Sequence, residues 1–164
     1  AITLESWSDS EIVGRMTADG WLNKPRYLDG TADTPRILAF VCQYALRSDA
    51  ELDRVSSLGD SVKAITLPCS GRVDPALILM ALNQGADGVL VAGCKEDECH
   101  YKRGTLLSRT KVGLLRELLA EAGIAQERLA FVELASLDRY ALAGLVGAMS
   151  REIQELAAAR VAAG

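Results

Sequence analysis

Positive charge and long apolar runs are both scarce in this sequence of 164 residues. The formal net charge is -4, and lysines and arginines are interspersed with acidic residues, which argues against nucleic acid as a partner. No apolar run approaches the roughly 20 residues that a membrane helix needs. The N-terminal stretch AITLESWSDSEI has neither the basic start nor the apolar centre of a signal peptide. We therefore expect a cytoplasmic protein.

Motifs for substrate chemistry are also missing. The sequence contains no Gly-rich phosphate loop, no Ser/His/Asp set and no paired carboxylates. Asp74 fits a helix cap better than an acid catalyst. Four cysteines are too few for a secreted fold held by disulfides, and in a reducing compartment such residues more often bind metal or carry out redox chemistry. The cysteines are thus the residues to place on the fold.

The sequence does contain a regular alternation of apolar runs and amphipathic stretches. Continuous apolar runs predict buried strands at residues 36–42, 62–68, 88–92 and 128–134. Strand and helix alternate four times along the chain. This pattern predicts an α/β domain with an open parallel four-stranded sheet and helices on both faces, of the flavodoxin-like or Rossmann-like kind.

Helix signals lie between these strands. Asp74 and Pro75 fit the cap and first residue of a helix that ends at Gly85. Ser48 and Glu51 fit a capping box that opens another helix. Two further helices are predicted at residues 105–122, where Leu107, Leu114, Leu115, Leu118 and Leu119 favour one side, and from about residue 137 onward.

Residues 1–35 do not follow this pattern. They contain both tryptophans, Trp7 and Trp21, in a stretch without clear periodicity. A free tail with both tryptophans would expose costly apolar area. We therefore expect an N-terminal extension at residues 1–35 that packs either on the domain of residues 36–164 or on a partner subunit.

Each of the four cysteines lies at or after the end of a predicted strand. Cys42 ends the first strand, Cys69 follows the second, Cys94 follows the third, and Cys99 is five residues further on. The carboxyl ends of parallel strands share one edge of the sheet, where open α/β folds keep their ligand sites. Four thiols at one edge predict a soft metal, either an iron–sulfur cluster or zinc. Only Cys94 and Cys99 form a close pair, which weakens the zinc alternative.

The residues next to these cysteines suit anionic sulfur. Ser70, Gly71 and Arg72 lead into a helix N-terminus, where free N–H groups and the helix dipole favour negative charge. Gly71 permits close backbone approach, and Arg72 supplies positive charge. With four thiols available, we expect His100 to lie near the metal or at the surface and not to be a ligand.

Several segments resemble the delta subunit family of methyl-viologen-reducing hydrogenase: PCSGRVDP, LNQGADGVLVAGC, DECHYKRG, RTKVGLLRELLAEAGI and ERLAFVELAS. The resemblance covers about residues 35–148. It implies a [2Fe-2S] cluster bound by Cys42, Cys69, Cys94 and Cys99. It also implies electron transfer between a hydrogenase, or another dehydrogenase module, and a heterodisulfide-reductase-like flavoprotein that bifurcates electrons. Two departures stand out: Ala45 occupies the position of a further family cysteine, and the family pattern GCHPGDCHY is GCKEDECHY here.

Three hypotheses of different classes follow. The first is an electron-transfer subunit of a larger oxidoreductase complex, with no catalytic site of its own. The second is a structural or assembly subunit whose four thiols bind zinc or no metal. The third is thiol–disulfide exchange through Cys94 and Cys99, which is disfavoured because the chain has neither a CxxC motif nor a catalytic base.

Overall fold

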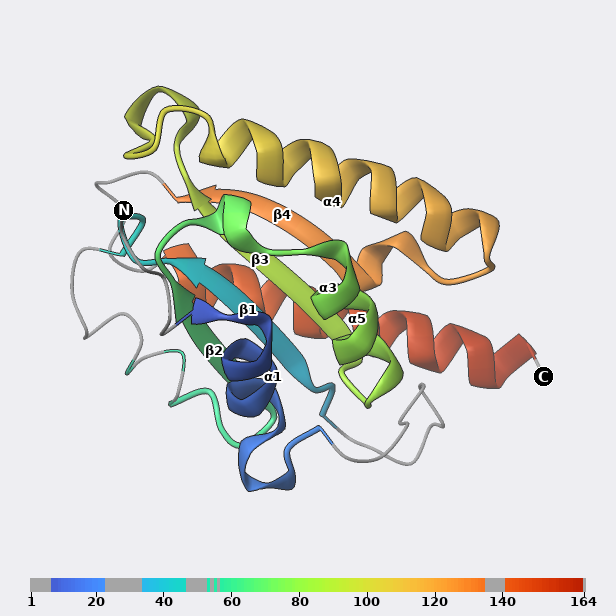
Figure 1. Ribbon diagram of the computed structural model, residues 1–164. Helices are drawn as coiled ribbons and strands as arrows, with labels where there is room; N and C mark the ends of the chain where they lie inside the picture. The colour runs from blue at the N-terminus through green and yellow to red at the C-terminus, as the bar shows by residue number, and fades with distance from the viewer. Residues whose placement is uncertain are drawn as a thin grey trace.

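The centre of the molecule is a parallel sheet of four strands (Figure 1). The computed structural model describes residues 7–22, 34–46, 53, 55, 57–134 and 141–163. The strands are β1 (Ile37–Cys42), β2 (Val62–Leu67), β3 (Gly88–Cys94) and β4 (Leu129–Leu134), in the order β2-β1-β3-β4. The four predicted strands are confirmed, with every end within two residues of its predicted position.

The two central strands, β1 and β3, are buried along their whole length. Their sequences, ILAFVC and GVLVAGC, are continuous apolar runs because both faces of the sheet are covered. The edge strands β2 and β4 are partly exposed. The sheet register pairs Val41 with Ala92, so the carboxyl ends of β1 and β3 lie side by side.

Helices cover both faces of the sheet (Figure 1). On one face lie α1 (Asp9–Thr17), α3 (Pro75–Asn83) and α4 (Gly104–Glu121), whose buried side chains share one apolar cluster. On the other face, α5 (Ala141–Ala163) contributes to a second cluster. The predicted α/β architecture is therefore confirmed. None of the described helices is both long enough and apolar enough to cross a lipid bilayer.

The predicted helix boundaries hold where the structure describes them. Asp74 caps α3, since its Oδ1 accepts a hydrogen bond of 2.8 Å from the N–H of Ala76, and Pro75 is the first helical residue. A glycine with positive φ follows both α3 and α4, as predicted. The capping box at Ser48 and Glu51 lies outside the described residues, as does the predicted start of the last helix near residue 137.

The sequence predicts five leucines on the buried side of α4, and this prediction is wrong for three of them. Leu107, Leu114 and Leu118 are 50%, 59% and 65% exposed. The first turns of α4 place Thr105 and Ser108 on the sheet side, and both are fully buried. Residues three, four and seven positions onward share a helix face, so the side that begins at Thr105 and Ser108 leaves the other leucine stripe in solvent.

The described part of the N-terminal segment lies against the sheet. Ile12 and Met16 of α1 are completely buried in the same cluster as side chains from the strands. The Nε1 of Trp21 donates a hydrogen bond of 2.6 Å to the carbonyl of Asp60. In the sequence this segment shows no clear pattern, yet it supplies part of the core.

Candidate metal centre

The strand order of the sheet reverses between β1 and β3, because β1 connects to β2 on one side while β3 and β4 lie on the other. In open α/β folds this switch point is where ligands bind, outside the carboxyl ends of the strands. Cys42 is the last residue of β1 and Cys94 is the last residue of β3. Both thiols are buried, and their Sγ atoms are 3.6 Å apart.

The other two cysteines lie at the same place. Cys69 hydrogen-bonds through its side chain to Cys42, and Cys99 is close enough to affect the charge of Cys69 and Cys94. A Cβ added to Gly104 would overlap the Sγ of Cys69 and lie 3.6 Å from that of Cys99. All four thiols are free. We refer to Cys42, Cys69, Cys94 and Cys99 together as the thiol edge.

Backbone N–H groups surround the sulfurs of the thiol edge. The N–H donors are Tyr44 and Ser70 for Cys42, Gly71 for Cys69, His100 for Cys94, and Tyr101, Gly104 and Thr105 for Cys99. Hydrogen bonds to the charged form favour it, and bonds of this kind help to set the potential of an iron–sulfur cluster. The site thus has donors in place for anionic sulfur.

These hydrogen bonds divide the four thiols electrostatically. Bonds from Cys69 and then Cys94 lower the pKa of Cys42 to about 2, although burial opposes this shift. The bond to Cys42 and then burial raise the pKa of Cys69 and of Cys94. Burial would raise the pKa of Cys99, but hydrogen bonds from Thr105 and from the backbone outweigh it and lower that pKa. Cys42 and Cys99 therefore carry thiolate most readily, and the thiolate is the form that binds metal.

The helix N-terminus that meets the sulfurs belongs to α4, which the sequence does not single out for this role. The Thr105 Oγ1 donates a hydrogen bond of 2.9 Å to the carbonyl of Cys94, and the N–H of Thr105 points to Cys99. The N-terminus of α3, which the sequence suggests instead, is capped by its own Asp74. Only the spacing of Gly104 and Thr105 directly after the cysteine loop hints at this arrangement.

Arg72 takes a different position from the predicted one. Its Nη2 is 2.6 Å from Asp9 Oδ1, and its Nε donates a hydrogen bond of 3.2 Å to the carbonyl of Trp7. The guanidinium thus binds the N-terminal segment, and backbone N–H groups take the place of its charge around the sulfurs. Ala45, at the position of the further family cysteine, is a buried residue of the turn after β1.

The spacing of the sulfurs tests whether these residues fit a metal. Two sulfurs at about 2.3 Å from one tetrahedral ion are about 3.8 Å apart, close to the 3.6 Å between Cys42 and Cys94. Within the described ranges, no three Cys, His, Asp or Glu side chains are arranged to hold one ion. The thiol pair is therefore preformed, and the four-thiol donor set suits zinc or an iron–sulfur cluster.

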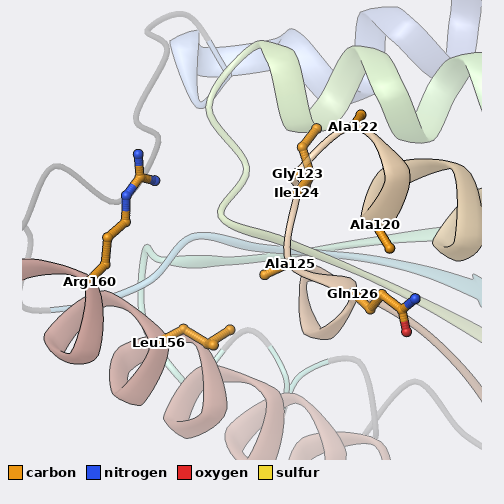
Figure 2. Close-up of a pocket in the computed structure, with 8 residues that line it drawn as sticks. All are labelled: Ala120, Ala122, Gly123, Ile124, Ala125, Gln126, Leu156 and Arg160. Atoms are coloured by element: carbon orange, nitrogen blue, oxygen red, sulfur yellow. The ribbon is translucent and has the colours of Figure 1, made fainter. Parts of the chain in front are cut away.

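A second hollow lies far from the thiol edge, between the turn after α4 and the outer part of α5 (Figure 2). Its volume is about 750 Å³. Its lining consists of Ala120, Ala122, Gly123, Ile124, Ala125, Gln126, Leu156 and Arg160. These residues include no thiol, carboxylate or imidazole, so the hollow offers no chemistry that compares with the thiol edge.

The sequence model of the methyl-viologen-reducing hydrogenase delta subunit family matches residues 37–157, which include all four cysteines. This chain belongs to that family. The resemblance seen in the sequence is thus confirmed, and the thiol edge lies in the part that the family model covers.

Curated relatives of this chain are of two kinds. A large subunit of the ferredoxin/F420H2-dependent CoB-CoM heterodisulfide reductase of Methanosarcina acetivorans is 33% identical over 74% of this chain, and the chain spans only 16% of that protein's length. The F420-non-reducing hydrogenase iron-sulfur subunit of Archaeoglobus profundus is 41% identical over 57% of this chain and 70% of the relative. The vhu iron-sulfur subunit of the same kind of hydrogenase from Methanococcus maripaludis is 34% identical over 74% of this chain and 92% of the relative.

Proposed function

We propose that this chain is an electron-transfer subunit that binds a [2Fe-2S] cluster through Cys42, Cys69, Cys94 and Cys99. It passes electrons between a hydrogenase, or another dehydrogenase module, and a heterodisulfide-reductase-like flavoprotein that bifurcates electrons. The observation that carries the proposal is the thiol edge, where four free thiols meet at the switch point of the sheet. Free thiols also suit a reducing compartment, so the proposal includes the cytoplasm.

The relatives support this role in two ways. Hydrogenase relatives are named as iron-sulfur subunits, and other relatives are named as subunits of heterodisulfide reductase. A domain that occurs both as a separate subunit and within a larger reductase protein fits a carrier between two redox modules. The absence of a substrate motif in the sequence fits the same role.

A [2Fe-2S] cluster at this site would accept and release single electrons. The chain's own residues hold the thiolates and control their surroundings. N–H groups from Ser70, Gly71 and Thr105 stabilise negative charge on sulfur, and burial of Cys42 and Cys94 keeps water away from the strand ends. Both effects act on the potential at which the site gains an electron.

The test is anaerobic purification followed by iron and sulfide analysis and electron paramagnetic resonance of the dithionite-reduced protein. We expect about two irons and two sulfides per chain and a rhombic signal. Cys94→Ser should abolish the signal. Ser108→Ala, a small change at a buried position of α4, is the control and should keep it. Zinc, or no metal at all, in the anaerobic protein would overturn the proposal.

A second candidate is a structural or assembly subunit with zinc on the same four cysteines. The 3.6 Å separation of Cys42 and Cys94 suits two ligands of one tetrahedral ion, which is the observation that favours it. The same preparation separates the two candidates, because a zinc site contains one metal ion and no inorganic sulfide. With zinc bound, the electron path would bypass this chain.

A further inference from the structure

Three aromatic rings pack against one another beside the thiol edge. Tyr44 and His100 are stacked, with ring centroids 3.7 Å apart and planes at 10°. Tyr101 meets Tyr44 and His100 edge-on, at 5.8 Å and 5.0 Å. Tyr44 lies in the turn after β1, whereas His100 and Tyr101 lie in the loop after β3. This ring cluster therefore joins two loops that are far apart in the sequence.

The same three residues also bind the sulfurs through their backbone. The N–H of Tyr44 points to Cys42, that of His100 to Cys94 and that of Tyr101 to Cys99. The fourth sulfur, on Cys69, takes its backbone N–H from Gly71, outside the ring cluster. Each member of the ring cluster thus places one donor at one sulfur.

The rings contribute little to the apolar core. Tyr44 and Tyr101 are each 45% exposed, and His100 is exposed as well. Next to Tyr101, Lys102 has a φ of 62°, a conformation that is unfavourable for a residue with a side chain. Such a conformation persists only where the surroundings hold it in place. Ring packing at the surface provides that restraint on the loop.

We propose that Tyr44, His100 and Tyr101 act as a clasp on the thiol edge. The clasp holds the turn after β1 against the loop after β3, so that three N–H donors stay in position and three sulfurs stay closed to solvent. Its members are positioning residues and not metal ligands. The inference deepens the proposed function by naming what controls access to its site, but the closure itself needs no metal.

The test measures how fast iodoacetamide alkylates each cysteine in the reduced, metal-free protein, followed by mass spectrometry. Loss of an aromatic contact should raise the open population about fivefold. We expect Tyr44→Ala and His100→Ala to speed alkylation of Cys42, Cys94 and Cys99 by that factor, with Cys69 changing least. Tyr44→Phe and His100→Phe keep the ring contacts and should stay near the wild-type rates.

The phenylalanine variants separate a clasp from a metal ligand, because phenylalanine can stack but cannot coordinate. Leu118→Ala, at an exposed position near the far end of α4, is the control and should change no rate. The proposal is overturned if Tyr44→Ala leaves all rates within about twofold of the wild type, or if His100→Phe reacts as fast as His100→Ala. An equal rise at all four cysteines also overturns it, because that pattern reports general unfolding. An iron-free preparation would overturn the cluster and leave the clasp standing.

Discussion

At the scale of single residues, Thr105 joins three parts of the thiol edge. Its hydroxyl donates to the carbonyl of Cys94, its N–H points to Cys99, and its own backbone opens α4. The side chain is 1% exposed. Removing the donor of a buried carbonyl costs more than removing a hydrogen bond that water can replace.

We therefore expect Thr105→Val to lower the free energy of unfolding by about 1–3 kcal/mol. Thr110→Val is a matched control, because Thr110 lies on the same helix and its exposed hydroxyl donates to Leu106 at the same distance of 2.9 Å. Its effect should stay within about 0.5 kcal/mol. Urea unfolding of both variants measures the difference, and equal effects would show that burial of the Thr105 hydroxyl does not matter.

At the scale of elements, α4 begins where it can approach the cysteine turn backbone to backbone. A Cβ on Gly71 would lie 3.1 Å from the Cα and the carbonyl oxygen of Gly104, and a Cβ on Gly104 would overlap Cys69. The Nζ of Lys111 adds a hydrogen bond of 3.1 Å to the carbonyl of Gly71. The start of this helix is thus shaped by the thiol edge and not by a capping side chain.

Two glycines of α4 should respond in opposite ways to alanine. Gly104→Ala should destabilise the protein by about 1–3 kcal/mol through overpacking and lower the iron content, because the new methyl group displaces Cys69. Gly113→Ala should stabilise it by about 0.5–1 kcal/mol, since a Cβ at Gly113 has no neighbour within 4 Å. Thermal unfolding and iron per chain measure both effects. Normal iron binding in Gly104→Ala would contradict this packing.

The strands and the position of the cysteines could be predicted because both depend on local pattern. A buried parallel strand is a continuous apolar run, and Cys42 and Cys94 stand at the ends of two such runs. The ring cluster could not be predicted in this way. Tyr44 and His100 meet only because β1 and β3 are neighbours, and a sequence pattern within either loop carries no trace of that contact.

The first helix left a weaker signal that was nonetheless present. Ser8 and Glu11 have the spacing of a capping box, and the Ser8 side chain accepts a hydrogen bond of 3.3 Å from the N–H of Glu11. Only Ile12 and Met16 of this nine-residue helix are buried, so its apolar period is too short to stand out. Tertiary packing decides such a helix more than its own periodicity does.

At the scale of the whole molecule, α1 helps to close one face of the sheet. We expect Ile12→Ala to lower the free energy of unfolding by about 2–4 kcal/mol, because Ile12 is completely buried. Val161→Ala, at an exposed position of α5, should change it by less than about 0.5 kcal/mol. Urea unfolding of the isolated chain measures both. An unchanged stability in Ile12→Ala would mean that the segment leaves the domain in solution.

The parallel sheet also dictates the order in which the site can form. Cys42 and Cys94 are 52 positions apart in the sequence, and β2 and α3 lie between their strands. Pairing of parallel strands needs long crossovers and is intrinsically slow to form. In a zinc finger, the metal drives folding of a chain that is otherwise unfolded. Here the crossovers must be complete before the thiols meet, so folding precedes metal insertion, and the newly made chain passes through a stage with four separate reduced thiols.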